Sequence, residues 1–198
     1  MSSNIEEKMK VQYITVVSGL PRSGTSLMSM MLEAGGMTVL TDNIRTADHD
    51  NPKGYYEFER VKKMPEGDFE WLEDTKGKAV KVIAVLLQHL PAKYQYKVIY
   101  MHRNIDEIIK SQNKMLVNLG KPLHNDDILI KKLLMKHSGS SRNWLDKQNN
   151  IEVLDIDYNQ LIINPVACLS EINKLLDFSL SIEKMQQSID QKLYRNRA

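Results

Sequence analysis

The sequence predicts a single α/β domain in which helices flank a central parallel sheet. Apolar, strand-like runs alternate with segments at helical spacing along most of the chain. A glycine loop, 19–24, lies between the first apolar run and the first helical segment. The length of 198 residues suits one compact domain with a real core. We therefore treat 1–198 as one domain, of which the polar residues 1–10 are expected to be disordered.

The expected strands are short apolar runs bounded by turn signals. The first is nearly continuously apolar, as is typical of a parallel strand covered on both faces. The four predicted strands cover residues 11–18, 79–85, 97–103 and 151–158.

The expected helices follow from apolar spacing and from start and stop signals. The first begins after the glycine loop and ends at Gly35-Gly36, and Asn164-Pro165 marks the start of a later one. Ser138-Gly139-Ser140 predicts a break in the longest. The remaining helices are expected at 105–119, 126–148, 165–177 and 180–190. The polar stretch 37–78 is predicted to be irregular and to carry substrate contacts.

The composition excludes several function classes. The chain is 42% hydrophobic and 26% charged, and its net charge of +2 is too near balance to indicate nucleic acid. The single cysteine, Cys168, excludes an intrachain disulfide and a cysteine metal cluster, and is read as a small buried packing residue. No apolar run is long enough to span a bilayer, and the first ten residues lack a signal-peptide core. The sequence predicts a cytoplasmic protein without a membrane or nucleic-acid partner.

The glycine loop has the spacing of a phosphate cradle. Gly19 and Gly24 allow backbone N–H groups to converge on an anion at the N-terminus of the next helix. Thr25 stands where a nucleoside triphosphatase carries its lysine, so the residue best suited to a triphosphate is absent. Arg22 supplies cationic charge from within the loop, and its fork can bind an oxyanion through two hydrogen bonds. The alternative is a tight strand–helix turn that binds nothing.

Residues 20–27, Leu-Pro-Arg-Ser-Gly-Thr-Ser-Leu, resemble the 5'-phosphosulfate loop of sulfotransferases that use 3'-phosphoadenylyl sulfate (PAPS). The form is closest to tyrosylprotein sulfotransferases and bacterial sulfotransferase-like proteins, since cytosolic sulfotransferases carry lysine at the position of Arg22. The resemblance extends from about residue 13 to 177. It implies a three-layer P-loop fold, PAPS as cosubstrate without a metal, and a small-molecule or peptide acceptor with a hydroxyl or amine.

A second motif resembles the family's 3'-phosphate site. Arg103 is expected to end a strand, and Ser111 lies about two helical turns later. A forked guanidinium with a hydroxyl donor can distinguish the 3'-phosphate of PAPS from the bare ribose of ATP. Taken alone, an arginine at this place is more often part of a structural ion pair. Tyr158 matches a tyrosine that contacts the adenine, although an ordinary strand-end tyrosine is equally consistent.

The resemblance assigns the following residues to the nucleotide: Arg22, Ser23, Gly24, Thr25, Ser26, Leu27, Arg103, Ser111 and Tyr158. The family's C-terminal loop carries basic residues toward the 3'-phosphate; here only Lys192, Arg195 and Arg197 are available for this role, without the glycine-rich form of that loop.

Sulfuryl transfer places developing charge on the bridging oxygen of the leaving phosphate, where cations stabilise it. Arg22 is the first candidate, and Lys81 is the second because it matches the lysine on the family's next catalytic strand. A structural lysine at a strand edge is the alternative for Lys81. The positions of the family's general bases hold Ile83 and Asn43, which cannot take a proton. Of the substitutes, Asp42 and Glu57 are favoured over Asp48, His49 and His89.

Two other functions stay open. A small-molecule kinase or other nucleoside triphosphatase of the P-loop class would turn over ATP with Mg²⁺, whereas a non-catalytic module would bind adenosine 3',5'-bisphosphate (PAP) or PAPS without transferring sulfate. The chain is short for the family, so the acceptor pocket is expected to be either open or completed by a partner subunit, and the second alternative would require a homodimer.

Overall fold

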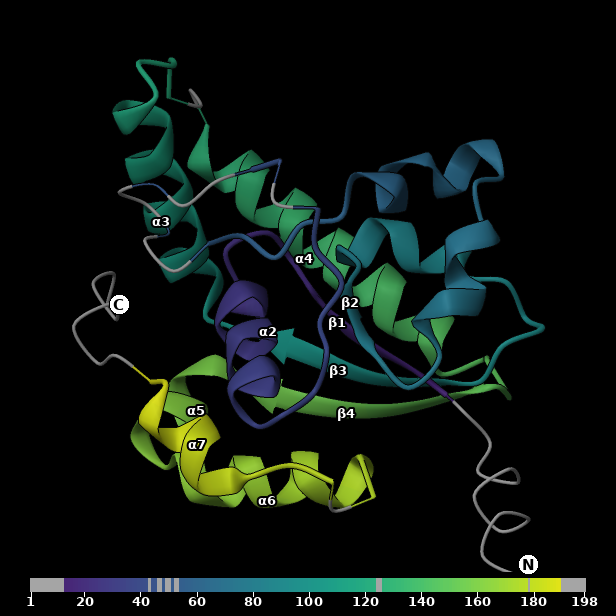
Figure 1. Ribbon diagram of the computed structural model, residues 1–198. Coiled ribbons are helices and arrows are strands. Elements are labelled where there is room, and N and C mark those ends of the chain that lie inside the picture. Colours follow the sequence, from purple (N-terminus) through teal and green to yellow (C-terminus); the bar gives the residue numbers. More distant parts are fainter. Residues whose placement is uncertain are drawn as a thin grey trace, which may run out of the picture.

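A computed structural model describes residues 13–42, 44–45, 48, 51, 54–123, 126–177 and 179–189. Its centre is a four-stranded sheet with the order β2-β1-β3-β4, in which every neighbouring pair is parallel. The carboxyl ends of all four strands therefore meet along one edge (Figure 1). The strands are β1 (Ile14–Gly19), β2 (Ala79–Lys81), β3 (Tyr96–His102) and β4 (Ile151–Asp157).

Six α-helices and three 3₁₀-helices are described. The α-helices are α2 (Thr25–Ala34), α3 (Ile105–Asn118), α4 (Asp127–Leu145), α5 (Tyr158–Ile163), α6 (Pro165–Leu175) and α7 (Ile182–Gln187). The 3₁₀-helices are η2 (Glu59–Glu66), η3 (Glu70–Thr75) and η4 (Ala84–His89).

Alternating side chains of the two inner strands build a core on each face of the sheet. Val17 and Ile99 belong to a cluster with apolar residues of α2, α5, α6 and α7. Val16 and Val98 belong to a second cluster with residues of η2, η3, η4 and α4. Helices thus cover both faces, which confirms the predicted three-layer α/β fold (Figure 1).

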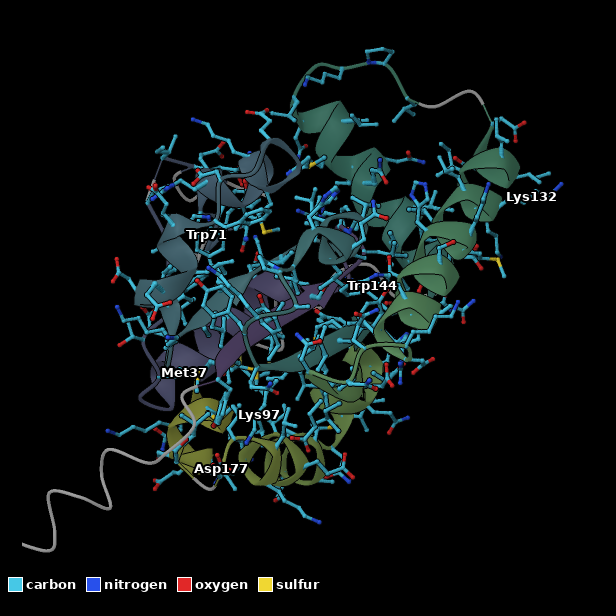
Figure 2. All side chains as sticks on the ribbon, turned by 90° about the vertical axis from the view of Figure 1, so that its right-hand side faces the viewer. Met37, Trp71, Lys97, Lys132, Trp144 and Asp177 are labelled. Atoms are coloured by element: carbon cyan, nitrogen blue, oxygen red, sulfur yellow. The ribbon has the colours of Figure 1, made fainter. Side chains whose placement is uncertain are left out.

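An ion pair also connects the segment after α6 to the sheet. Lys97 near the start of β3 lies 2.9 Å from a carboxylate oxygen of Asp177, which follows α6. The two side chains lie next to each other in Figure 2. Cys168 of α6 is partly buried against the core cluster that contains Val17 and Ile99, and it is not fully enclosed.

The strand expected at 79–85 is shorter than predicted. β2 ends at Lys81, and the apolar residues that follow form η4, in which Ala84 and Leu87 are buried. β2 is an edge strand with β1 as its neighbour, so few ladder bonds hold this run extended. A short apolar run does not by itself distinguish a strand from a buried helical turn.

The predicted break in the longest helix is wrong. α4 runs unbroken through Gly139, and the hydroxyl of Ser141 donates a 3.0 Å hydrogen bond to the carbonyl of Ala84. This tertiary contact outweighs the modest cost of a helical glycine. Two further expectations were also wrong: Tyr158 opens α5 instead of ending a strand, and the stretch 37–78 contains η2 and η3.

Some expectations lie outside the described residues: those for residues 1–10, Asn43, His49 and the basic residues Lys192, Arg195 and Arg197. Within the part of the chain that is described, we find no helix with both the length and the apolar character needed to cross a membrane.

Candidate functional site

The glycine loop after β1 is tightly enclosed by the rest of the fold. Gly19 has φ 146° and Gly24 has φ 104°, backbone conformations that favour glycine. A Cβ on Gly19 would lie 2.6 Å from the carbonyl oxygen of Met101, and one on Gly24 would lie 2.4 Å from the ring of Tyr158. Glycine is therefore required at both ends of the loop because β3 approaches Gly19 closely and α5 approaches Gly24 closely.

Arg22, inside the loop, links it to α3. Its φ of 71° is unusual for a residue other than glycine. Its Nε donates a 2.9 Å hydrogen bond to the hydroxyl of Ser111, which is 3% exposed. The two predicted anion-binding motifs, far apart in the sequence, are thus in direct contact at the carboxyl edge of the sheet.

Arg103 has two protein partners next to the loop. Its Nε donates to the carboxylate of Glu107 at 2.9 Å, and its Nη1 donates to the carbonyl of Arg22 at 3.1 Å. The guanidinium carbon lies 4.4 Å from the centre of the Tyr158 ring. The side chains of Arg103 and Glu107 are 7% and 2% exposed, so the structural ion pair considered from the sequence is present. It holds the guanidinium against the loop.

Lys81, at the end of β2, reaches the start of α2 from the other side. Its Nζ donates to the carbonyl of Tyr55, lies 3.4 Å from the hydroxyl of Ser26 and lies 3.8 Å from a carboxylate oxygen of Glu57. Burial lowers the pKa of Lys81 from 10.5 to about 8, although the charge of Glu57 opposes this change. Because its pKa is about 8, the buried Lys81 amine still carries a proton at pH 7 and can bind an anion.

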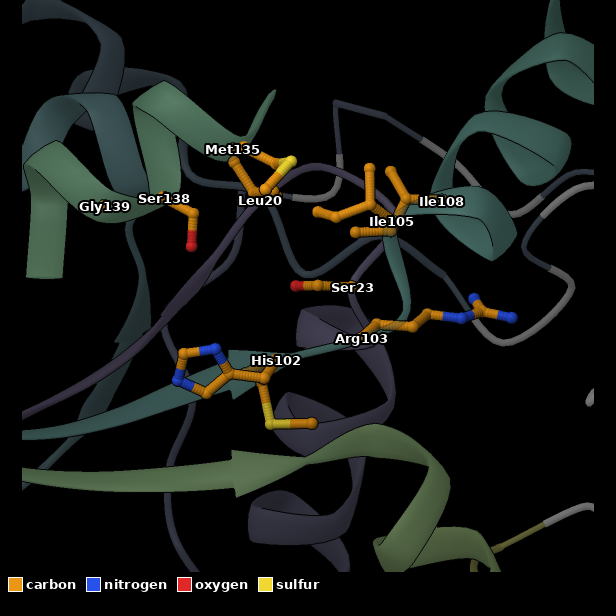
Figure 3. A pocket seen from close by; sticks show the side chains of 10 residues that line it. Leu20, Ser23, His102, Arg103, Ile105, Ile108, Met135, Ser138 and Gly139 are labelled. Carbon is orange, nitrogen blue, oxygen red and sulfur yellow. The ribbon is translucent and has the colours of Figure 1, made fainter. Parts of the chain in front are cut away.

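A pocket of about 290 Å³ opens beside the loop (Figure 3). It is bounded by the end of β3, the first turn of α3 and the middle of α4. Its lining residues are Leu20, Ser23, Met101, His102, Arg103, Ile105, Ile108, Met135, Ser138 and Gly139. Two of these, Ser23 and Arg103, are predicted nucleotide residues, so the pocket adjoins the predicted anion site.

A comparison with family models decides the family. The model described as a sulfotransferase domain matches residues 14–196. The chain belongs to the sulfotransferase family. This membership supports a sulfotransferase activity.

Solved sulfotransferases have a similar fold. Mouse sulfotransferase SULT7A1 complexed with PAP aligns with a TM-score of 0.53 and 19% identity, over 96% of this chain and 67% of the mouse chain. A sulfotransferase domain from the curacin biosynthetic pathway aligns at 0.55 and 14%, over 93% and 80% of the two chains. STF1 from Mycobacterium tuberculosis aligns at 0.55 and 14%, over 99% and 74%. A comparison with curated protein sequences finds no match.

The two favoured base candidates of this sulfotransferase hold the polypeptide in place. Asp42 accepts hydrogen bonds from the backbone N–H groups of Ile44 and Glu59, at 3.0 and 2.6 Å. Glu57 accepts a 2.8 Å bond from Arg45 and lies near Lys81. The structure brings Glu57, but not the carboxylate of Asp42, into contact with another predicted catalytic group. Both assignments stay predictions.

The other described substitutes, Asp48 and His89, have polar partners of their own. Asp48 accepts a hydrogen bond from the hydroxyl of Tyr55, and His89 lies 3.5 Å from the side-chain nitrogen of Gln88. His49 is outside the described residues.

Sequence reasoning missed His102, which lines the pocket. Its Nε2 lies 2.7 Å from a carboxylate oxygen of Asp155, and Arg142 binds the same carboxylate. The register of the strands could have indicated this contact. Tyr100 pairs with Asp155, and His102, two residues further along β3, points to the same face of the sheet as Tyr100. Although burial alone raises the pKa of Asp155, hydrogen bonds from His102 and Arg142 lower it below its ordinary value.

Among the described residues, no group of three histidine, cysteine or acidic side chains is placed to hold a metal ion. The expectation that the reaction needs no metal remains a prediction.

Proposed function

We propose that this protein transfers the sulfuryl group of PAPS to a hydroxyl or amine of a small molecule or peptide. The observation that carries the proposal is the hydrogen bond between Arg22 and Ser111, together with the bond from Arg103 to the Arg22 carbonyl. These contacts join the 5'-phosphosulfate motif to the 3'-phosphate motif. The presence of PAP in the mouse relative supports the same ligand class.

In this proposal the loop residues from Ser23 to Leu27 and the N-terminus of α2 bind the 5'-phosphosulfate. Arg22 and Lys81 stabilise the charge that develops on the bridging oxygen as its bond to sulfur breaks. The 3.4 Å distance between Nζ of Lys81 and the hydroxyl of Ser26 supports this role for Lys81. An anion next to Lys81 favours the protonated amine, which offsets the effect of burial.

Arg103 and Ser111 bind the 3'-phosphate, and Tyr158 supports the adenine. Glu107 already occupies the Nε of Arg103, so the phosphate shares the guanidinium with a buried carboxylate. Arg103 can serve both partners because a guanidinium carries five N–H donors. The Tyr158 ring, packed against Gly24 and Arg103, lies at the junction of the two motifs.

One observation favours a non-catalytic PAP- or PAPS-binding module as a second candidate. The carboxylates of Asp42 and Glu57 are engaged by backbone N–H groups and by Arg45, respectively. The cytoplasmic location, the homodimer, and the expectation of no nucleic-acid or membrane partner stay predictions.

Calorimetric titration with PAP and with ADP tests the proposal. We expect PAP to bind more tightly, because ADP lacks the 3'-phosphate. Arg103→Ala should weaken PAP binding by roughly ten- to a hundred-fold, the effect of losing hydrogen bonds to a charged group. Arg60→Ala, a surface arginine paired with Asp68, is the matched control and should bind PAP normally. A preference for ADP together with Mg²⁺-dependent ATP turnover would favour a kinase instead.

Turnover separates the enzyme from the binding module. Release of PAP from PAPS, measured with a broad set of alcohols and amines, is expected to depend on the acceptor. PAP binding without transfer to any acceptor would support the module.

A further inference from the structure

His102 forms a charged cluster that the nucleotide site does not use. Its Nε2 lies 2.7 Å from Asp155 of β4, and Arg142 of α4 binds Asp155 through Nη2 at 2.9 Å. Arg142 also pairs with Asp146 one helical turn away. Asp155 is thereby fixed between two partners and holds the imidazole ring in one orientation.

This contact determines which ring nitrogen of His102 can accept a proton. An ionised carboxylate only accepts hydrogen bonds, so in the neutral imidazole the hydrogen lies on Nε2 and donates to Asp155. Nδ1 then carries the lone pair. Figure 3 shows Nδ1 on the side of the ring that faces Ser138 across the pocket. The pocket therefore contains a ring nitrogen whose lone pair is available to accept a proton, on an imidazole that Asp155 holds in place.

The pocket wall has the character of a site for a small amphipathic molecule. The lining includes the apolar side chains of Leu20, Ile105 and Ile108. It also includes the hydroxyls of Ser138 and Ser23, and the Ser23 hydroxyl is fully buried and makes no hydrogen bond with the described residues. A buried hydroxyl without a partner is costly unless a ligand or water completes it. A volume of about 290 Å³ is at the small end of ligand sites.

We propose that this pocket binds the acceptor as a phenol or a similarly small alcohol, and that Nδ1 of His102 accepts the acceptor's proton. The inference rests on the proposed function, because PAPS supplies the sulfuryl group. Ser23 belongs to both the loop and the pocket wall, so an acceptor there lies next to the donor site.

The acceptor oxygen forms a bond to sulfur while the bond between sulfur and the 5'-phosphate oxygen breaks, and that electron pair leaves with PAP. The acceptor's O–H proton moves to Nδ1 of His102. The resulting imidazolium is held by Asp155 and later releases the proton to solvent.

A series of para-substituted phenols tests the role of His102. General-base catalysis matters most for weakly acidic phenols and least for 4-nitrophenol, which ionises near neutral pH. His102→Gln should therefore lower the transfer rate by roughly a hundred-fold or more on the least acidic phenols, and by much less on 4-nitrophenol. A purely structural role would lower all rates by one factor. Asp155→Asn should show the same trend with a smaller loss.

Three controls accompany the series. His137→Gln, on α4 but outside the pocket wall, should leave every rate unchanged. Ser138→Leu fills the pocket and should raise KM for the phenols. Calorimetry should give the same PAP affinity for wild type, His102→Gln and Ser138→Leu, which verifies that the variants fold.

The outcomes distinguish this inference from the proposed function. Failure of the wild-type protein to bind PAP would overturn both. If PAP binds, then wild-type rates in His102→Gln, or one constant loss across the series, would overturn the role of His102 alone. If PAP binds but no phenol accepts sulfate from the wild-type protein, the assignment of the pocket is overturned.

Discussion

Replacing Lys81 with methionine should make the protein more stable at neutral pH while impairing sulfuryl transfer. Lys81 is 8% exposed, and burial lowers the pKa of its amine from 10.5 to about 8. At pH 7 the folded and unfolded states both carry the proton, so the folded state bears the full cost of burying the charge. A difference of about 2.5 pKa units corresponds to about 3 kcal/mol. Loss of the hydrogen bond to the Tyr55 carbonyl reduces the gain, so we expect about 1 to 3 kcal/mol.

The advantage of the methionine variant should depend on pH. Above pH 8 the folded wild-type protein releases this proton while the unfolded chain keeps it until about pH 10.5. Because the unfolded state then binds more protons, wild-type stability from this group rises with pH over that interval. The difference in the free energy of unfolding between Lys81→Met and the wild-type protein should therefore decrease by about 2 kcal/mol between pH 7 and pH 10.

Urea unfolding at pH 7 and pH 10 measures this directly. The same substitution at the exposed Lys147 serves as the control, and its difference in the free energy of unfolding from the wild-type protein should not change with pH in this way. For Lys81→Met, a difference that is constant from pH 7 to pH 10 would refute the account of a buried, destabilised ammonium at residue 81. Retention of wild-type transfer from PAPS by Lys81→Met would remove that residue from the proposed chemistry.

Three further substitutions test the loop, the buried ion pair and α4. Gly24→Ala should lower the free energy of unfolding by about 2 to 4 kcal/mol and weaken PAP binding, because residue 24 has φ 104° and its new Cβ would lie 2.4 Å from the Tyr158 ring. An unchanged urea midpoint and an unchanged PAP affinity would contradict the description of the loop as tightly enclosed. By contrast, Gly139→Ala lies in a helix with open space around it and should raise stability by up to about 1 kcal/mol, so a lower midpoint would show a missed contact. Glu107→Gln should destabilise the free protein by about 3 kcal/mol, because it leaves the buried Arg103 without its charged partner. The variant should nevertheless bind PAP at least as tightly as the wild-type protein, because a carboxylate no longer competes with the 3'-phosphate for Arg103. Weaker binding in calorimetry would mean that the carboxylate is needed to orient the guanidinium.

Local patterns predicted the centre of the fold well. An apolar run followed by Gly19, Gly24 and a helical segment gave β1, the loop and α2 close to their observed bounds. The error at 79–85 has a physical cause: an edge position supplies too few ladder bonds, and η4 buries Leu87 more readily than an extended chain would. The unbroken α4 depends on a bond from Ser141 to a residue far away in the sequence, which no local window reveals.

The site was predictable in part for a similar reason. The motif resemblance named Arg22 and Ser111, and the structure places them 2.9 Å apart. The ion pair of Arg103 with Glu107 follows the i, i+4 helical spacing and was available from the sequence as the structural reading. His102 was not predicted because nothing in its local sequence distinguishes it from a strand-end residue. Its environment comes from a neighbouring strand, so register rather than local pattern reveals it.

The contact between Gly24 and the Tyr158 ring has a consequence for how the molecule assembles. The glycine is made early during synthesis, whereas the ring that packs on it arrives only with the last third of the chain. Contacts of such large sequence separation form late because long loops must close first. A nascent chain lacking β4 and α5 would thus contain the loop's residues without the surface that shapes them, so affinity for the nucleotide should emerge only when synthesis is nearly complete.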